Sequence, residues 1–326
     1  MSLRVALFGQ AQFGKDTLEG LLQRGHEVVG VFAPPEGARP DPLAERAKEL
    51  RIPLIRRRFF RKKGGAAIPE AVEEYRALEA ELNVLASVQV FIPSEITDAP
   101  KHKSICFHPS LLPLYRGGAA IQWQIIDGVQ RTGVSIFVPD EGADTGPVVV
   151  QKGGVPIEAT DTTSSLFFNK LQPLGVEAIL EAVDLIDAGK ASPQVQDESR
   201  ATHQGLITDE VAAIDLSRSA AEIDRLVRGC DPQPGAFVRY DGHPVRLFDA
   251  TLEVAEAGEP GEIVDGRITE SGDDNKDAIR PERARLVNLI GVDREVLAQH
   301  RQRAGGAGVR QVLVGALEKV PIGQHR

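Results

Sequence analysis

Residues 3–32, LRVALFGQAQFGKDTLEGLLQRGHEVVGVF, predict a strand, a turn, a helix and a second strand. The apolar run at 3–8 has the length of a strand, and leucines recur at helical spacing over 17–22. A second apolar run at 27–32 is rich in β-branched valine. Such an alternation is typical of a parallel sheet covered by helices.

The same alternation continues along the chain. Further helices are expected at 43–50, 69–82 and over most of 161–188, and further strands at 52–55, 83–86, 104–108, 133–139 and 147–152. After about Pro193, a polar segment leads to a helix at 220–229 and to short strands at 237–240 and 245–248, whereas 295–320 shows helix-like periodicity broken by glycines. The prediction is an α/β protein with a Rossmann-like, mostly parallel sheet in residues 1–204 and a smaller, β-rich, OB-like domain in residues 205–326.

The composition excludes several classes of protein. The chain has 326 residues, enough for about two domains. With 38 Lys and Arg against 47 Asp and Glu, the formal net charge of -9 disfavours sequence-blind attraction to nucleic acid or anionic lipid. Two cysteines, Cys106 and Cys230, exclude a disulfide framework and a four-cysteine zinc site and favour the cytoplasm. No apolar run approaches the roughly 18 residues of a membrane helix, and the N-terminus does not resemble a signal peptide.

The turn after the first strand comes close to a phosphate-binding loop. Residues 9–17, GQAQFGKDT, contain the Gly, the four-residue gap and the Gly-Lys pair, but Asp16 stands where the motif needs Ser or Thr to hold magnesium. Gly9 and Gly14 are the only glycines of the turn, so the dinucleotide fingerprint fails as well. A tight strand-to-helix turn is the favoured interpretation.

A basic run occupies residues 51–63. It holds seven Lys and Arg side chains around Phe59 and Phe60, so it can meet an anionic ligand, such as a polyglutamate tail or RNA, through charge and stacking. A solvated surface loop is the alternative, and it is the favoured one.

Two side chains that can share acid–base chemistry follow predicted strands. The strand at 104–108 ends in His108, and open parallel sheets bind their ligands at that edge. Residues 140–146, DEGADTG, follow another strand, so Asp144 reaches the same edge if the two strands are parallel. A carboxylate bonded to one ring nitrogen raises the basicity of the other, which suits general acid–base catalysis on water or an amine. A structural histidine is the alternative. The other histidines lack metal-ligand spacing, so no metal site is expected.

The segment that begins at His108 resembles the signature of the formyltransferases that use 10-formyltetrahydrofolate. The likeness runs from Leu3 to about Ala250, and in several segments it is greatest to the amino-terminal hydrolase domain of 10-formyltetrahydrofolate dehydrogenases. The stretches that carry the resemblance are HPSLLP at 108–113, RG at 116–117, IQW at 121–123, DEGADTG at 140–146, GHEVVGVF at 25–32 and AELNVL at 80–85.

The resemblance implies a catalytic set that contains His108 and Asp144. The family carries an Asn two positions before the His, and Cys106 stands there in this chain. In the transferases that amide resembles an oxyanion donor, worth about 2.7 to 4 kcal/mol, and a thiol is a weaker donor. The hydrolase domains also depart from Asn, with an apolar residue, so Cys106 is more similar to them. A nucleophile that forms a thioester is the other interpretation of Cys106, and a buried apolar strand opposes it.

The resemblance also implies where the folate and the acceptor bind. The pteridine is expected against the strand-end loops near residues 85–91 and 140–144, and residues 110–116 are expected to line the acceptor side. The residues assigned to folate and substrate binding are Leu85, Gln89, Phe91, Ile92, Ser110, Leu112, Pro113, Arg116, Gly117 and Asp140. After about Gly261, the sequence departs from the closing strands of the family.

Three functions follow from these expectations. The first is hydrolysis of 10-formyltetrahydrofolate to tetrahydrofolate and formate, with His108 as general base and acid and Asp144 orienting it. The second is transfer of the formyl group to an amine on a small metabolite, a sugar nucleotide or methionyl-tRNA. The net charge disfavours tRNA, as does the absence after Phe32 of the insertion that methionyl-tRNA formyltransferases carry. The third is a non-catalytic folate-binding module that serves a separate aldehyde-dehydrogenase-type partner. Folate is the cofactor expected, without a metal, and the sequence leaves the oligomeric state open.

Overall fold

The computed structural model describes residues 2–240, 243–248, 250–254, 263–264, 267–269 and 284–287. Two compact units make up the chain. Unit 1 consists of Met1–Ala120, Arg131–Pro156 and Phe167–Gly205, and unit 2 consists of Ile121–Gln130, Ile157–Leu166 and Leu206–Arg326. The helix-like segment expected at 295–320 lies outside the described residues.

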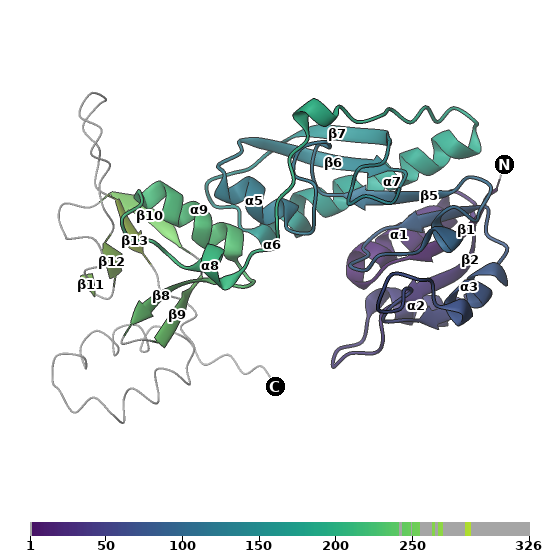
Figure 1. Cartoon of the computed structure of the whole chain (residues 1–326), viewed down its shortest axis with the longest axis horizontal. Helices are drawn as coiled ribbons and strands as arrows, with labels where there is room; N and C mark the ends of the chain where they lie inside the picture. Colours follow the sequence, from purple (N-terminus) through teal and green to yellow (C-terminus); the bar gives the residue numbers. More distant parts are fainter. Residues whose placement is uncertain are drawn as a thin grey trace. The chain divides into compact units, whose positions relative to one another are not determined.

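A seven-stranded sheet forms the centre of unit 1 (Figure 1). In spatial order, its strands are β3 (Leu54–Arg56), β2 (Glu27–Ala33), β1 (Arg4–Phe8), β4 (Leu82–Leu85), β5 (Ser104–His108), β6 (Arg131–Phe137) and β7 (Val148–Pro156). The first five pair in parallel, whereas β6 and β7 pair antiparallel to their neighbours. The prediction of a Rossmann-like, mostly parallel sheet is therefore confirmed.

Helices flank this sheet in the order expected from the sequence. They are α1 (Ala11–Gln23), α2 (Pro42–Glu49), α3 (Pro69–Arg76), α4 (Ser94–Thr97) and α7 (Gln172–Asp187), with a π-helical turn (Phe167–Leu171) before α7 and a 3-10 turn (Glu198–Arg200) after it. Helix α1 begins six residues before the predicted start because the cap comes from a distant residue. Asp41 accepts a hydrogen bond from the backbone N–H of Ala11 at 2.6 Å and another from Ala44 at 2.9 Å, so one carboxylate caps both α1 and α2. That carboxylate occupies the helix end that a phosphate-binding loop would offer to a phosphate.

Strand β5 presents successive side chains to opposite faces of the sheet. Phe107 meets Phe13 of α1, with ring centroids 4.7 Å apart. Cys106 packs instead against the apolar cluster of the other face, where Phe8 and Phe32 stack with ring centroids 4.4 Å apart. Because residues two apart in a strand share a face, His108 projects on the same side as Cys106.

Unit 2 combines short helices with antiparallel strands. Its helices are α5 (Ala120–Ile126), α6 (Thr163–Leu166), α8 (Asp209–Ala212) and α9 (Ala220–Cys230). Strands β8 (Ala236–Tyr240) and β9 (His243–Leu247) form a hairpin, and a second sheet has the order β10 (Thr251–Val254), β13 (Ala284–Val287), β12 (Arg267–Thr269) and β11 (Ile263–Val264). The predicted smaller β-containing C-terminal region is thus present. No helix in the described part of the chain has the length and apolar character needed to cross a membrane.

Candidate active site

His108 lies at the carboxyl end of β5 and is 5% exposed. The loop that follows the strand turns back, so that the backbone carbonyl of Tyr115 lies 2.7 Å from Nε2 of the imidazole. A carbonyl oxygen only accepts hydrogen bonds, so Nε2 must carry the hydrogen. When the ring is neutral, its lone pair is therefore on Nδ1, and Nδ1 is the atom of His108 that can act as a base.

Asp144 faces this lone pair. Its Oδ2 lies 3.5 Å from Nδ1 of His108 and accepts a hydrogen bond of 2.8 Å from the backbone N–H of Gly117. The separation from Nδ1 is longer than an ordinary hydrogen bond but within the range of an ion pair, so a proton taken up by Nδ1 would be stabilised by the carboxylate. The two side chains thus lie close together, as the sequence analysis predicted.

The route by which Asp144 arrives differs from the expected one. The prediction relied on parallel strands, but β6 is antiparallel to β5, with Phe137 at its end opposite Cys106. The segment after β6 then folds back on itself, and the N–H of Val138 donates to the carbonyl of Pro147 at 2.9 Å. A loop, rather than the shared edge of a parallel sheet, brings the carboxylate to His108.

Burial sets the protonation states of the two side chains on this face of β5. It lowers the pKa of His108, and the charge of Asp144 and the hydrogen bond to Tyr115 oppose that effect. The imidazole is therefore neutral at pH 7 and ready to accept a proton. Burial, followed by the charge of Asp144, raises the pKa of the Cys106 thiol well above its ordinary value. A neutral thiol is a poor nucleophile, which disfavours the thioester interpretation of Cys106.

A hydroxyl in β6 anchors the loop that carries the predicted substrate residues 110–117. Ser135 is fully buried, and its Oγ accepts hydrogen bonds from the N–H of Leu112 at 3.1 Å and from the amide of Gln151 at 2.9 Å. The same hydroxyl donates to the carbonyl of Ser110 at 2.7 Å. Pro113 follows in this loop and is half-buried. These bonds fix the path of the loop beside His108.

The guanidinium of Arg116 is buried rather than open to an acceptor. The residue is 5% exposed, and its side chain donates to Gln196 at 2.8 and 3.1 Å and to Glu198 at 2.7 and 2.9 Å. Its assignment to substrate binding stays a prediction, and the observed hydrogen bonds are those of a side chain that organises the loop ending at Gly117.

The residues assigned to the folate occupy different environments. Leu85 and Ile92 are buried in the apolar cluster of Phe8 and Phe32, whereas Phe91 is 64% exposed. Asp140 uses one carboxylate oxygen within its own turn, where Oδ1 accepts hydrogen bonds from the N–H of Gly142 and the hydroxyl of Thr145. These side chains do not converge on one point, and their roles stay predictions.

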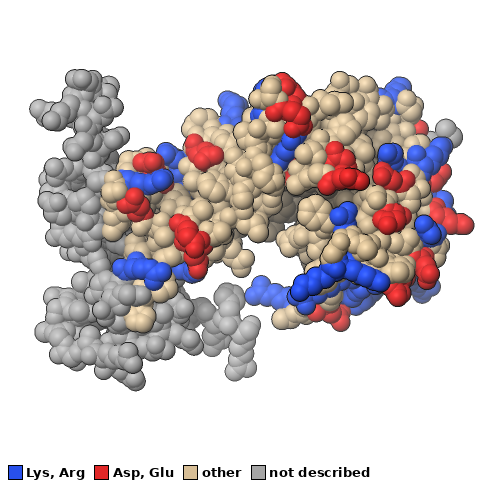
Figure 2. All heavy atoms as spheres, in the orientation of Figure 1, with Lys and Arg blue, Asp and Glu red and all other residues tan. Residues whose placement is uncertain are grey.

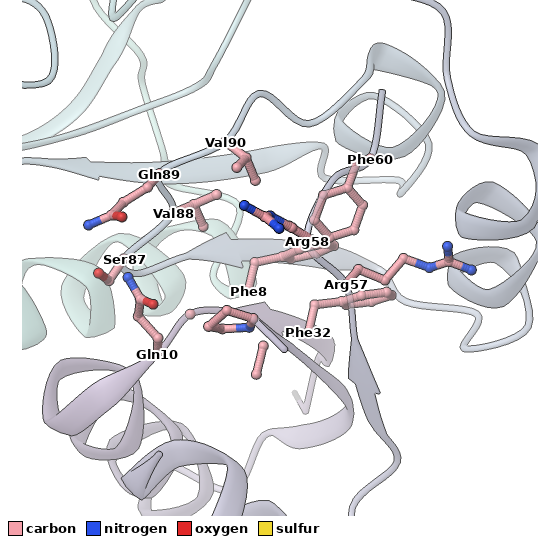
Figure 3. A pocket seen from close by; sticks show the side chains of 13 residues that line it. Phe8, Gln10, Phe32, Arg57, Arg58, Phe60, Ser87, Val88, Gln89 and Val90 are labelled. Carbon is pink, nitrogen blue, oxygen red and sulfur yellow. The ribbon is translucent and has the colours of Figure 1, made fainter. Parts of the chain in front are cut away.

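A pocket of about 120 Å³ lies at the carboxyl ends of β1, β2 and β4 (Figure 3). Of the residues assigned to the folate, Gln89 lines it, beside Phe60 and Gln10. Figure 3 shows the guanidinium of Arg58 turned into the pocket, whereas the side chain of Arg57 runs away from it. Arg57 forms an ion pair with Glu74 at 2.7 Å, so Arg58 is the cation that faces the pocket.

The basic run of residues 51–63 supplies further charge next to this pocket. Arg58 lies over the exposed ring of Phe59 at 5.4 Å, and Arg61 lies over Phe91 at 5.7 Å. Lys62 is exposed in the turn that follows. On the face shown in Figure 2, Lys and Arg side chains gather in a strip over the violet and blue part of the chain in Figure 1. This arrangement fits either a solvated surface or contact with an anion.

Two further residues of the site gave no recognisable signal in the sequence. Tyr115 acts through a backbone carbonyl, which every residue possesses, and Gln196 lies in a polar segment that resembles a linker. Within the described part of the chain, no group of three or more His, Cys, Asp or Glu side chains could hold a metal ion.

Comparison with known proteins places the chain in a family. The profile described as Formyl transferase matches residues 3–183, and that described as Formyl transferase, C-terminal domain, matches residues 206–271. The mitochondrial 10-formyltetrahydrofolate dehydrogenase of Homo sapiens is 39% identical over 286 residues, and the alignment covers 84% of this chain but 31% of that protein. The chain thus spans less than a third of that relative. The methionyl-tRNA formyltransferase of Geobacter sulfurreducens is 34% identical over 269 residues, which cover 80% of this chain and 82% of that protein.

Solved structures share the fold. The N-formyltransferase from Helicobacter canadensis, in complex with folinic acid and dTDP-3-aminofucose, matches with a TM-score of 0.67 and 17% identity over 88% of this chain and 99% of that one. HypX from Aquifex aeolicus, in complex with tetrahydrofolic acid, matches with a TM-score of 0.63 and 21% identity over 88% of this chain and 44% of that one. The family and the fold expected from the residues around His108 are thereby confirmed, and the chain belongs to the formyl transferase family.

Proposed function

We propose that the protein hydrolyses 10-formyltetrahydrofolate to tetrahydrofolate and formate. The observation that carries the proposal is the pair of the buried His108 and the half-buried Asp144, in which the free lone pair of the imidazole faces the carboxylate. The residue two positions before His108 also supports hydrolysis. An amide at this position would favour transfer, but Cys106, on the same face of β5, offers only a weak thiol donor. The relative from Homo sapiens, whose name specifies 10-formyltetrahydrofolate, supports the choice of substrate.

The proposed reaction uses His108 first as a base and then as an acid. Nδ1 takes a proton from water as the water oxygen attacks the formyl carbon, and Asp144 stabilises the resulting imidazolium across 3.5 Å. The tetrahedral intermediate then breaks its bond to N10 of the folate. N10 takes the proton from Nδ1 as that bond breaks, so tetrahydrofolate leaves and the imidazole returns to its neutral form. Formic acid leaves with it and releases its proton to the solvent as formate.

The folate is proposed to lie along the strand ends that carry Gln89 and Arg58. Glutamate carboxylates of the folate would meet the cations of residues 51–63, of which Arg57 and Arg58 line the pocket. The pteridine would then lie toward the loop of residues 140–144, where backbone groups are available to bind it.

The proposal is tested by incubating the protein with 10-formyltetrahydrofolate in the absence of any amine. Formation of tetrahydrofolate is followed spectroscopically and compared with a His108→Ala variant whose folding is checked by circular dichroism. Release of tetrahydrofolate by the wild type at a rate no higher than that of the variant would rule the proposal out.

Transfer to an amine is the second candidate. The relative from Geobacter sulfurreducens favours it, because a protein named methionyl-tRNA formyltransferase aligns over 82% of its own length with this chain. The formal net charge of -9 disfavours a nucleic-acid acceptor and leaves small amines as the more suitable class. A gain of one formyl group on an amine in a mass-spectrometric screen, faster than the release of formate, would favour transfer over hydrolysis.

A further inference from the structure

The side chain of Gln196 bridges the turn that carries Asp144. Its Nε2 donates one hydrogen bond to the backbone carbonyl of Asp144 at 2.8 Å and another to that of Gly146 at 2.7 Å. Gln196 is 7% exposed, so these bonds are sheltered from water. Both amide hydrogens of one side chain are therefore used to hold a single turn.

The other end of the same amide is fixed by a buried cation. Oε1 of Gln196 accepts hydrogen bonds from Nε and Nη2 of Arg116 at 3.1 and 2.8 Å, and Arg116 is held in turn by Glu198. The residue after Arg116 is Gly117, whose N–H holds the carboxylate of Asp144. One connected network therefore fixes the backbone of the turn through Gln196 and its carboxylate through Gly117.

The backbone of Asp144 needs such support. Its φ of 58° lies in the left-handed region, which Asp enters more readily than most residues with a side chain but which is still uncommon. Conformations of this kind persist when the surrounding structure over-determines them. The two hydrogen bonds from Gln196 act on the carbonyls of residues 144 and 146, which directly follow this φ in the chain.

We propose that Gln196 is a positioning residue, which holds the Asp144 turn so that the carboxylate faces Nδ1 of His108. The inference rests on the proposed function in that it takes His108 and Asp144 as the reacting pair. Gln196 itself touches neither side chain. Its contribution is the geometry of the turn, and a displacement of about 1 Å in such a constellation can lower a rate about 100-fold.

The first test needs no substrate. The titration of His108 is followed by NMR, with its signal assigned by its loss in His108→Gln. The groups that face the imidazole are the carboxylate of Asp144 and the carbonyl of Tyr115, and the carboxylate is the charged one. Cys106, on the same face of β5, is a neutral thiol because its pKa is raised. Because that charge raises the pKa of His108 against the effect of burial, Gln196→Met is expected to lower it, in the same direction as Asp144→Asn. A folded Gln196→Met variant in which His108 titrates as in the wild type would overturn the proposal.

The second test separates positioning from folding. Gln196→Glu keeps an oxygen for Arg116 but removes the hydrogens that bind the two carbonyls of the turn, so kcat is expected to fall by about 10- to 100-fold in a variant that circular dichroism shows to be folded. Gln194→Glu, an exposed site two residues earlier, makes the same change in charge and is expected to keep the wild-type kcat. Wild-type kcat in Gln196→Glu would refute a positioning role. If the wild type turns over no 10-formyltetrahydrofolate, the proposed function fails, and the NMR titration still decides the role of Gln196.

Discussion

Replacing Asp144 by Asn tests the candidate site most directly, because it removes one charge and almost no volume. The carboxylate accepts a hydrogen bond from Gly117 and faces Nδ1 of His108 at 3.5 Å. Oδ2 makes both contacts, so the amide of the variant can either keep its oxygen there and accept from Gly117 or turn its NH2 group toward Nδ1 and lose that bond. In either orientation, the imidazolium formed in the reaction loses its counter-charge.

The expected loss follows from the distance. Two unit charges 3.5 Å apart interact by about 5 kcal/mol at an effective dielectric constant of about 20. A positioned general base contributes about 10²- to 10⁴-fold to a rate, which corresponds to roughly 3 to 5 kcal/mol. We therefore expect kcat of Asp144→Asn to fall by about 10²- to 10⁴-fold, with a small change in KM because the loop of residues 140–144 is proposed to bind the pteridine through backbone groups.

The dependence of the rate on pH gives an independent check. The neutral imidazole is the active form, so kcat/KM rises with pH through the pKa of His108. Burial lowers that pKa and Asp144 raises it, so removal of the carboxylate moves the acid limb of the profile to lower pH. The assay is the formation of tetrahydrofolate between pH 4.5 and 9, with Glu141→Gln, an exposed carboxylate in the same loop, as the matched control. Activity of Asp144→Asn within threefold of the wild type, with an unmoved acid limb, would refute the assigned roles.

Three further predictions concern the thiols, a buried ion pair and the loop anchor. Burial raises the pKa of Cys230 to about 11 and that of Cys106 further, so both thiols should react slowly with iodoacetamide in the native protein at pH 8. Rapid alkylation detected by mass spectrometry would contradict these raised pKa values. Asp224→Ala removes the carboxylate that lies 2.8 Å from the buried guanidinium of Arg228, and it should lower the free energy of unfolding, measured in urea, by about 3 to 5 kcal/mol. An unchanged urea midpoint would mean that the pair is open to water. Ser135→Ala removes the hydroxyl that anchors the loop after β5, so it should lower the free energy of unfolding by about 1 to 3 kcal/mol and also reduce the turnover rate. Full stability together with full activity would exclude an anchoring role.

The sequence predicted the order of elements in unit 1 better than their directions. Apolar runs of strand length gave the strands, because burial on both faces requires such runs in a central sheet. The runs that form β6 and β7 look the same as those of the parallel strands, since hydrophobic patterning carries no information on direction. The start of α1 was misplaced because its cap is the side chain of Asp41, 30 residues away. Contacts of that range are not encoded in a local pattern.

The residues of the candidate site likewise differ in how well the sequence predicts them. His108 and Asp144 were recognisable because their chemistry resides in side chains, within motifs of fixed spacing. The carbonyl of Tyr115 determines which imidazole nitrogen is the base, yet any residue with the same backbone path would supply it. Gln196 lies 52 residues after Asp144, in a polar segment, so neither its spacing nor its surroundings indicate that its amide holds the turn.

The antiparallel pairing of β5 and β6 explains why the support of Asp144 matters. His108 lies at the end of β5 and is held there by the pairing of this residue with Ser135 of β6. Asp144 lies in a loop that returns from β6, so its place depends on a small set of bonds from Gly117 and Gln196. The two members of the proposed reacting pair are therefore held in different ways, one by the sheet and the other by loop and side-chain contacts. Substitutions near the Asp144 turn should change the rate more than they change the stability of the sheet.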